Sequence, residues 1–180
     1  MRTVATTLAI VLLFAAPLAW GHDDQPTTFS AAWTEYAAIQ QSLAGDSLDG
    51  VAERARNLRD IARAAAADFD AGHAGVTEKS GPTCRELLPR LAAAAVELAD
   101  AGSLDAARSA FARLSEEMIA FRRMVPGEGP RVAYCPMARH SWLQDGDKIA
   151  NPYYGKKMLR CGQFRDDKNA PDHGQQMHGH

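Results

Sequence analysis

Apolar side chains between residues 28 and 125 recur at three- and four-residue intervals, the spacing that places them on one face of an α-helix. Ala, Leu, Arg and Glu dominate this stretch, and Gly, Ser and Pro interrupt it. The pattern predicts four helices joined by short turns, over residues 29–43, 48–71, 84–101 and 104–125. Such helices favour an antiparallel four-helix bundle over residues 29–125, so we predict an all-α fold.

Three local features refine this prediction. Ser103 is placed to cap the fourth helix, and Pro89 is expected to kink or restart the third. Ser47-Leu48-Asp49 has a counterpart 56 positions later in Ser103-Leu104-Asp105, which marks either two related helical hairpins or a chance similarity. Helical spacing also assigns three aromatic residues to the core: Trp33, Phe111 and Phe121.

The character of the chain changes after Val125. Pro126-Gly127-Glu128-Gly129-Pro130 ends the last helix, and the residues that follow are rich in Gly, Pro, Asn, Tyr, Cys and Met. We expect residues 126–165 to form an irregular segment that packs on the bundle. The final stretch, residues 166–180, is polar and is expected to be a disordered tail.

The first 21 residues have the order of a secretory signal peptide: one positive charge at Arg2, an apolar run from Leu8 to Leu18, and then small residues. The run is shorter than the roughly 20 residues that a permanent membrane span needs. Cleavage after Gly21 leaves a flexible N-terminus, residues 22–28, and cleavage after Ala19 is the alternative. We therefore predict an exported, periplasmic protein with no membrane attachment once the signal is removed.

Composition and motifs exclude several functions. The chain has 20 basic and 22 acidic residues, a net charge of −2, and it has no basic patch interleaved with aromatic residues, so nucleic acid is not an expected partner. It also has no phosphate-binding glycine loop, no Gly-x-Ser-x-Gly turn and no Cys-x-x-Cys-His motif for heme. No arrangement of catalytic residues is evident, and we predict that the protein is not an enzyme.

The informative chemistry is sulfur. Cys135 and Met137 lie two positions apart around a proline, and Met158 and Cys161 lie three apart, so each pair can direct a thiolate and a thioether toward a common point. Ligands of this kind favour copper(I) or silver(I) over hard ions. The sequence therefore suggests a soft-metal site built from these four residues. The third cysteine, Cys84, lies near the start of a helix and is expected to be buried.

A disulfide between Cys135 and Cys161 is the alternative, because cysteines in an oxidising compartment commonly pair. Such a bridge would stabilise this part of the chain by about 3 kcal/mol, and the two methionines would then only fill gaps. The protein would in that case be a stapled protein–protein interaction domain without metal. A thiol–disulfide enzyme is the least favoured interpretation, because the chain has no Cys-x-x-Cys pair. The spacing leaves metal site and disulfide open.

The same segment resembles a known family. The resemblance rests on Cys135-Pro136-Met137, Trp142-Leu143-Gln144, Ile149, Asn151-Pro152-Tyr153-Tyr154-Gly155, Met158 and Cys161-Gly162, together with Ala110-Phe111 and Leu114-Ser115 in the last helix. These residues look like the signature of the DUF3347 family of periplasmic domains, over roughly residues 30–164. Family members occur alone or fused to adaptor subunits of heavy-metal efflux pumps resembling CusB. The resemblance implies copper or silver handling for resistance or delivery, with Cys135, Met137, Met158 and Cys161 as ligands and an efflux adaptor as partner.

Further donors are accessory candidates. Imidazole and thioether groups near the C-terminus could capture a copper ion and pass it inward, or they could belong to an ordinary solvated tail. These candidates are His140, His173, Met177, His178 and His180. If His22 is the first residue after cleavage, its amine and imidazole could chelate copper(II), although an ordinary disordered start is the preferred explanation. Trp142, Tyr153 and Tyr154 are expected to cover the sulfur site or to pack the segment on the bundle.

Overall fold

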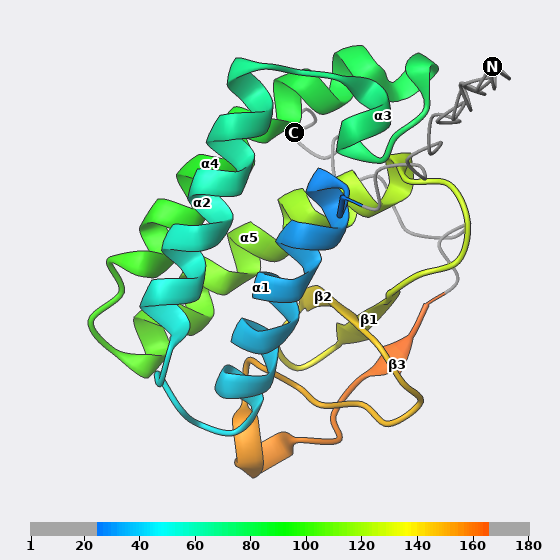
Figure 1. The fold of residues 1–180 in the computed structure, drawn as a ribbon. Helices are drawn as coiled ribbons and strands as arrows, with labels where there is room; N and C mark the ends of the chain where they lie inside the picture. The colour runs from blue at the N-terminus through cyan, green and yellow to red at the C-terminus, as the bar shows by residue number, and fades with distance from the viewer. Residues whose placement is uncertain (1–24, 166–180) are drawn as a thin grey trace, which may run out of the picture.

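The helical part of the chain forms a bundle in the computed structural model, which describes residues 25–165. Each long helix packs on the next, α1 on α2, α2 on α4 and α4 on α5, and α5 returns to α1 (Figure 1). The helices are α1 (Thr28–Ala44), α2 (Val51–Ala67), α3 (Ala71–Ala74), α4 (Gly81–Ala99) and α5 (Leu104–Met124), with a 3₁₀ turn, η1 (Glu78–Ser80), before α4. The predicted signal peptide, His22 and the C-terminal tail lie outside the described residues.

Local signals explain most of the helix ends. The Thr27 hydroxyl accepts a hydrogen bond from the Ser30 N–H at 3.2 Å, and the Ser103 hydroxyl accepts one from the Ala106 N–H at 3.2 Å, as expected of N-caps. Helix α2 instead begins after Gly50, which has a left-handed backbone with φ 72°. The two similar segments at 47–49 and 103–105 therefore form different turns, so they do not mark two equivalent hairpins.

Pro89 lies within α4 and does not divide it, so the predicted restart of the helix at this position does not occur. A proline inside a helix removes one backbone hydrogen bond and crowds the carbonyl one turn earlier. Pro89 is exposed, so the carbonyl that loses its partner can turn toward water. The opposite side of the same turn buries Leu87, Leu88 and Leu91, and this burial outweighs the local cost.

The prediction of an all-α fold is wrong, because residues 126–165 contain a three-stranded antiparallel sheet. The strands are β1 (Arg131–Cys135), β2 (His140–Gln144) and β3 (Gln163–Phe164), in the order β2-β1-β3. Strands β1 and β2 form a hairpin in which Val132 pairs with Leu143 and Cys135 with His140. The strands are too short, and their mixture of Cys, Trp, Ser and His too irregular, to give a clear two-residue period. Pairing between distant segments supplies the order that the local pattern lacks.

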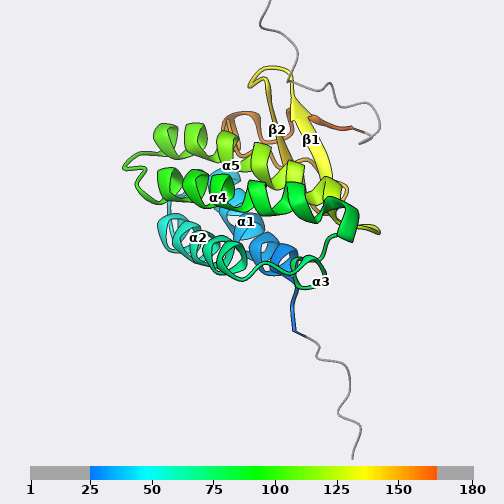
Figure 2. The same cartoon turned by 90° about the horizontal axis from the view of Figure 1, so that it is seen from above.

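The sheet lies beside α5, on one side of the bundle (Figure 2). The outer edge of β2 meets the helices through a buried contact: the Leu143 N–H donates to the Tyr36 hydroxyl at 3.1 Å, and that hydroxyl lies 2.7 Å from the Ser115 hydroxyl. This contact satisfies a strand edge that would otherwise be unpaired. Within residues 25–165, no helix has both the length and the apolar composition needed to cross a membrane.

Candidate metal-binding site

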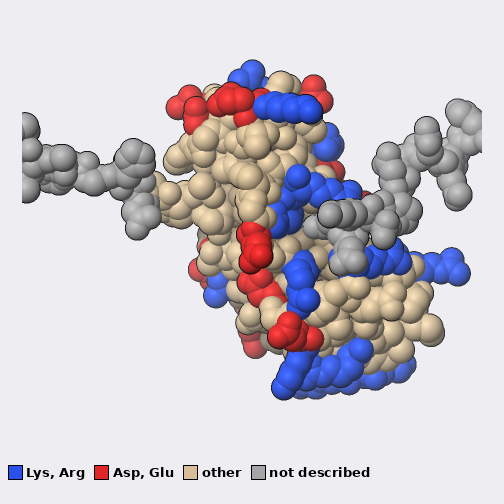
Figure 3. All heavy atoms as spheres, turned by 90° about the vertical axis from the view of Figure 1, so that its right-hand side faces the viewer, with Lys and Arg blue, Asp and Glu red and all other residues tan. Residues whose placement is uncertain are grey.

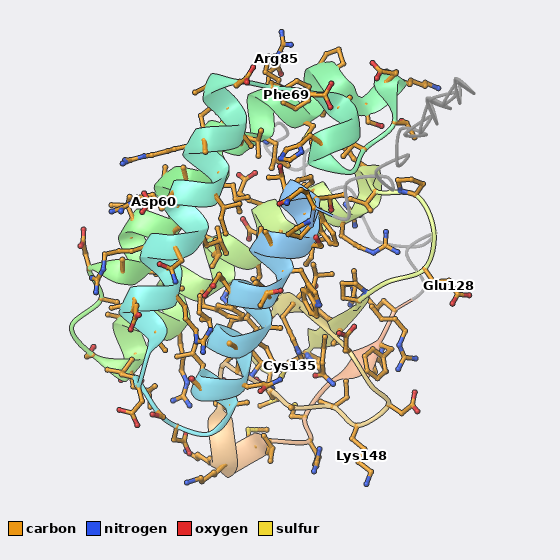
Figure 4. All side chains as sticks on the ribbon, in the orientation of Figure 1. Asp60, Phe69, Arg85, Glu128, Cys135 and Lys148 are labelled. Carbon is orange, nitrogen blue, oxygen red and sulfur yellow. The ribbon has the colours of Figure 1, made fainter. Side chains whose placement is uncertain are left out.

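Two of the four predicted sulfur ligands meet in the structure. The Sγ atoms of Cys135 and Cys161 are 3.0 Å apart. Cys135 is the last residue of β1, and Cys161 follows the 3₁₀ helix η2 (Gly155–Met158). Figure 4 shows Cys135 in the lower half of the molecule, where the sheet lies. Cys135 is fully buried and Cys161 is half-buried, so the pair is open to solvent only on the Cys161 side.

The hairpin between β1 and β2 directs backbone N–H groups at the Cys135 sulfur. The loop closes with a hydrogen bond from the Arg139 N–H to the Cys135 carbonyl at 2.8 Å, and the Ala138 N–H donates to the Cys135 Sγ at 3.4 Å. The Met137 N–H also forms hydrogen bonds with both sulfurs, and these favour the ionised form of each thiol. Donors of this kind stabilise a thiolate, which is the form that binds metal.

The two thiols therefore differ in acidity. Burial opposes ionisation of Cys135, but hydrogen bonds from the Cys161 thiol, the backbone and Asn151 outweigh it and lower the pKa of Cys135. The hydrogen bond that Cys161 donates to Cys135, followed by partial desolvation and by the charge on Cys135, raises the pKa of Cys161. The pair thus loses its first proton more readily than a free cysteine and its second less readily.

A pH titration of thiolate absorbance checks this difference. In reduced Cys84→Ala protein we expect one thiolate to form below the usual cysteine range and the second to form above it, because the first charge opposes the second. A Cys135→Ser, Cys84→Ala variant should lose the low-pH step. Two superimposed steps at the ordinary cysteine pKa would contradict the hydrogen-bonded pair.

Asn151 organises the segment that carries Cys161. Its side chain is fully buried; besides its hydrogen bond to Cys135, Oδ1 accepts from the Tyr153 N–H at 2.8 Å and the Tyr154 N–H at 3.3 Å, and Nδ2 donates to the Cys161 carbonyl at 2.8 Å. The Asn151 N–H in addition donates to the Leu159 carbonyl at 2.9 Å. Asparagine supplies both acceptor and donors, so it can satisfy a turn and a distant carbonyl together.

A second amide fixes the same segment to the sheet. Gln144, the last residue of β2, accepts hydrogen bonds from the Trp142 indole at 3.0 Å and the Ala150 N–H at 2.9 Å, and it donates to the Lys148 carbonyl at 2.7 Å. On the helix side, the Gln40 amide donates to the Ala150 carbonyl. The motif residues Trp142, Gln144 and Asn151 thus hold the backbone that positions the cysteines.

An ion pair attaches the start of η2 to the helices. Arg108 on α5 pairs with Asp46 and donates to the Pro152 carbonyl at 2.9 Å, and Asp46 accepts the Lys156 N–H at 3.0 Å. The hydrogen bond from Arg108 is the largest of the effects that lower the pKa of Asp46. Gly155 lies against this pair with φ 53°, and a Cβ atom there would overlap the Asp46 carboxylate. Glycine is required here for both conformation and space.

Aromatic side chains surround the site and also pack its segment on the bundle, the two roles predicted for them as alternatives. The Trp142 ring is fully buried and makes an edge contact with Tyr153 at 5.9 Å, and Tyr153 in turn lies 6.0 Å from Phe111 in the bundle. The Tyr154 hydroxyl donates to the Met137 carbonyl at 3.4 Å and so joins the two cysteine-bearing segments. These residues both cover the site and connect it to the helices.

The remaining predicted ligands take different positions. Met137 is 62% exposed and Met158 is half-buried, so the thioethers lie at the surface of the site. His140 pairs with Cys135 across the hairpin and packs on Tyr153 at 5.1 Å. Cys84 is buried, as predicted, and burial raises its pKa to about 11. His173, Met177, His178 and His180 lie outside the described residues.

The thiol pair is a two-ligand site in the part of the chain that the structure describes. Among residues 25–165, no group of three His, Cys, Asp or Glu side chains is arranged to hold a metal ion. Zinc normally takes four ligands in a structural site, whereas copper(I) also accepts two thiolates.

Sequence reasoning missed the basic residues next to the cysteines. Arg139 lies in the hairpin loop, and Lys156, Lys157 and Arg160 lie on or beside η2; all four are exposed. The signal was present in the sequence, because residues 132–144 and 148–165 contain six Lys and Arg and no Asp or Glu. The net charge of the whole chain is only −2, so it does not reveal this local excess of basic residues.

Comparisons with protein-family models, with curated proteins and with solved structures found no match for this chain. The resemblance to the DUF3347 family therefore stays a prediction that rests on the motif residues quoted above.

Proposed function

We propose that this chain is an exported copper(I)- or silver(I)-binding protein whose site is the Cys135–Cys161 pair. The observation that carries the proposal is the 3.0 Å approach of two sulfur atoms from segments 26 positions apart. One of these sulfurs is favoured as a thiolate by N–H donors, and the other is accessible from solvent. Copper(I) prefers thiolate ligands, and this pair can supply two of them to one ion.

Binding requires a modest change in the site. With metal–sulfur bonds of about 2.3 Å, two thiolates on one ion lie about 3.8 Å apart in tetrahedral geometry and farther apart in a linear one. From their present distance of 3.0 Å, the sulfurs must therefore separate by about 0.8 Å for tetrahedral geometry and by about 1.6 Å for a linear one. Cys161 can supply this movement because it is half-buried and follows a short 3₁₀ turn, whereas Cys135 is fixed at the end of β1.

Copper(I) titration under reducing conditions, in competition with a chromogenic chelator, tests the proposal. We expect a Cys135→Ser, Cys161→Ser variant to bind copper(I) at least about 100-fold more weakly than the unmodified protein, or about 2.8 kcal/mol. Cys84→Ala is the matched control and should bind normally, because Cys84 is buried in α4 and is not part of the pair. Equal affinity in the double variant and the control would contradict the site.

The second candidate, a disulfide-stapled interaction domain, is favoured by the same short separation. A sulfur–sulfur bond of about 2.05 Å needs only a further small approach of the two side chains. Counting free thiols in denatured protein, isolated from the cell envelope with thiols trapped by alkylation, separates the two functions. Three free thiols support the metal site, and one supports the staple.

A further inference from the structure

The surface around the thiol pair is basic, although the helical part of the protein is not. Residues 25–125 contain 11 basic and 14 acidic side chains, whereas residues 126–165 contain seven basic and three acidic ones. The three acids, Glu128, Asp145 and Asp147, all lie outside the two cysteine-bearing stretches, 132–144 and 148–165. Figure 3 shows Lys and Arg gathered along the lower edge of the molecule, the end where η2 lies in Figure 1.

Arg139, Lys156 and Lys157 form the part of this surface that we call the basic rim. Arg139 is four positions from Cys135, and Lys157 is four positions from Cys161. The two halves of the rim are joined by the hydrogen bond between Tyr154 and the Met137 carbonyl. Among the described residues, no carboxylate forms an ion pair with any of the three rim side chains, which are exposed.

We propose that the basic rim docks the acidic face of a partner protein that exchanges a soft metal ion with the Cys135–Cys161 pair. This inference rests on the proposed function for the identity of the ion. The three rim side chains are exposed, as is Met137 with 62% of its surface, and Cys161, four positions from Lys157, is the more exposed of the two cysteines. A partner attracted by the rim is thereby brought to the open side of the site.

Exchange needs no change of oxidation state. A donor sulfur of the partner forms a bond to copper(I) while the bond from copper(I) to the Cys161 sulfur breaks, and the Met137 thioether can bind the ion during the change. The partner's cysteine thiols lose their protons as they bind the ion, and the released Cys161 and Cys135 thiolates each take one up through water. The buried Cys135 sulfur leaves last, when a second donor of the partner replaces it. The ion remains copper(I) throughout, so no oxidant or reductant takes part.

Two synthetic peptides test the rim. They carry the same two methionine and two cysteine donors, and the flanking residues are Asp and Glu in one and Lys in the other. Copper(I)-loaded protein is mixed with each peptide, and the rate of metal transfer is followed for the unmodified protein and for an Arg139→Gln, Lys156→Gln, Lys157→Gln variant. An Arg56→Gln, Arg63→Gln, Lys79→Gln variant is the control, because it removes the same charge from exposed positions on the helical part.

At about 0.01 M salt we expect transfer to the acidic peptide to be roughly tenfold slower from the rim variant than from the control, and the difference to disappear at about 1 M salt. Equal rates in the two variants would overturn the docking proposal while leaving copper(I) binding intact. If the unmodified protein does not retain copper(I), the proposed function fails by itself. Fluorescence anisotropy of the labelled acidic peptide with metal-free, reduced protein then tests the rim alone.

Anionic vesicles distinguish a protein partner from a lipid surface. The unmodified protein is incubated with vesicles of phosphatidylglycerol and phosphatidylcholine and then sedimented. We expect weaker rim-dependent binding to these vesicles than to the acidic peptide. Rim-dependent binding to the vesicles without binding to the peptide would assign the basic surface to a membrane and overturn the proposal.

Discussion

Replacing Asn151 with alanine is expected to lower the free energy of unfolding by about 3 kcal/mol. The side chain is fully buried, and its loss leaves the Tyr153 and Tyr154 N–H groups and the Cys161 carbonyl without their partners. A buried polar group without a hydrogen bond costs about 1–3 kcal/mol, and water that reaches some of these groups offsets part of the sum. Urea unfolding of the reduced protein, followed by far-ultraviolet circular dichroism, measures the change.

Asn57→Ala is the matched control, because Asn57 is exposed on α2 and its replacement should change stability by less than about 0.5 kcal/mol. The Asn151 variant should also alkylate faster at Cys161, because the turn that holds this cysteine is no longer fixed. A loss of stability below about 1 kcal/mol, with unchanged alkylation at Cys161, would show that the turn does not depend on Asn151.

Trp142→Ala should be the most destabilising of the substitutions considered, with an expected loss of about 3–5 kcal/mol. The indole is fully buried in β2, makes an edge contact with Tyr153 and donates to Gln144 at 3.0 Å. It also fills the space next to Gly162, where a Cβ atom would lie 2.8 Å from the ring. Removing it leaves a cavity between the sheet and the segment that carries Cys161.

Trp33→Ala provides the comparison. Trp33 stacks on Tyr36 but is only half-buried, so its removal should cost less than half as much as the loss of Trp142. Equal losses in the two variants, measured by calorimetry, would contradict the larger contribution expected from the fully buried Trp142. A smaller loss for Trp142 would contradict the packing described for residues 126–165.

The sequence alone predicted the helices because their signals are local. A 3.6-residue period, a hydroxyl cap at Ser103 and a glycine at the end of α1 are each contained within a few turns of chain. The burial of Cys84, Phe111 and Phe121 follows from the same periodicity. Trp33 was assigned to the core but is only half-buried, because exposure on a helix also depends on which neighbouring elements cover that face.

The sequence predicted only part of the site. Spacing identified four sulfur side chains as candidates but could not show which would meet. Cys135 and Cys161 come together because β3 and the Asn151 turn return the chain to β1, while the turn of the hairpin leaves Met137 exposed. The basic rim was visible as a run without acids, yet its position around the thiols depends on the same return of the chain.

The sequence by itself thus determined a helical region followed by a cysteine-bearing segment, because helix periodicity and capping are properties of neighbouring residues. The tertiary structure decided that this segment is a sheet and that two particular thiols face each other. Strand β3 has two residues and pairs with β1 across about thirty positions, so no local pattern could reveal it. Its position depends on the hydrogen bond that Asn151 donates to the Cys161 carbonyl and the one that Gln144 accepts from the Ala150 N–H, which form only when distant parts of the chain are already together.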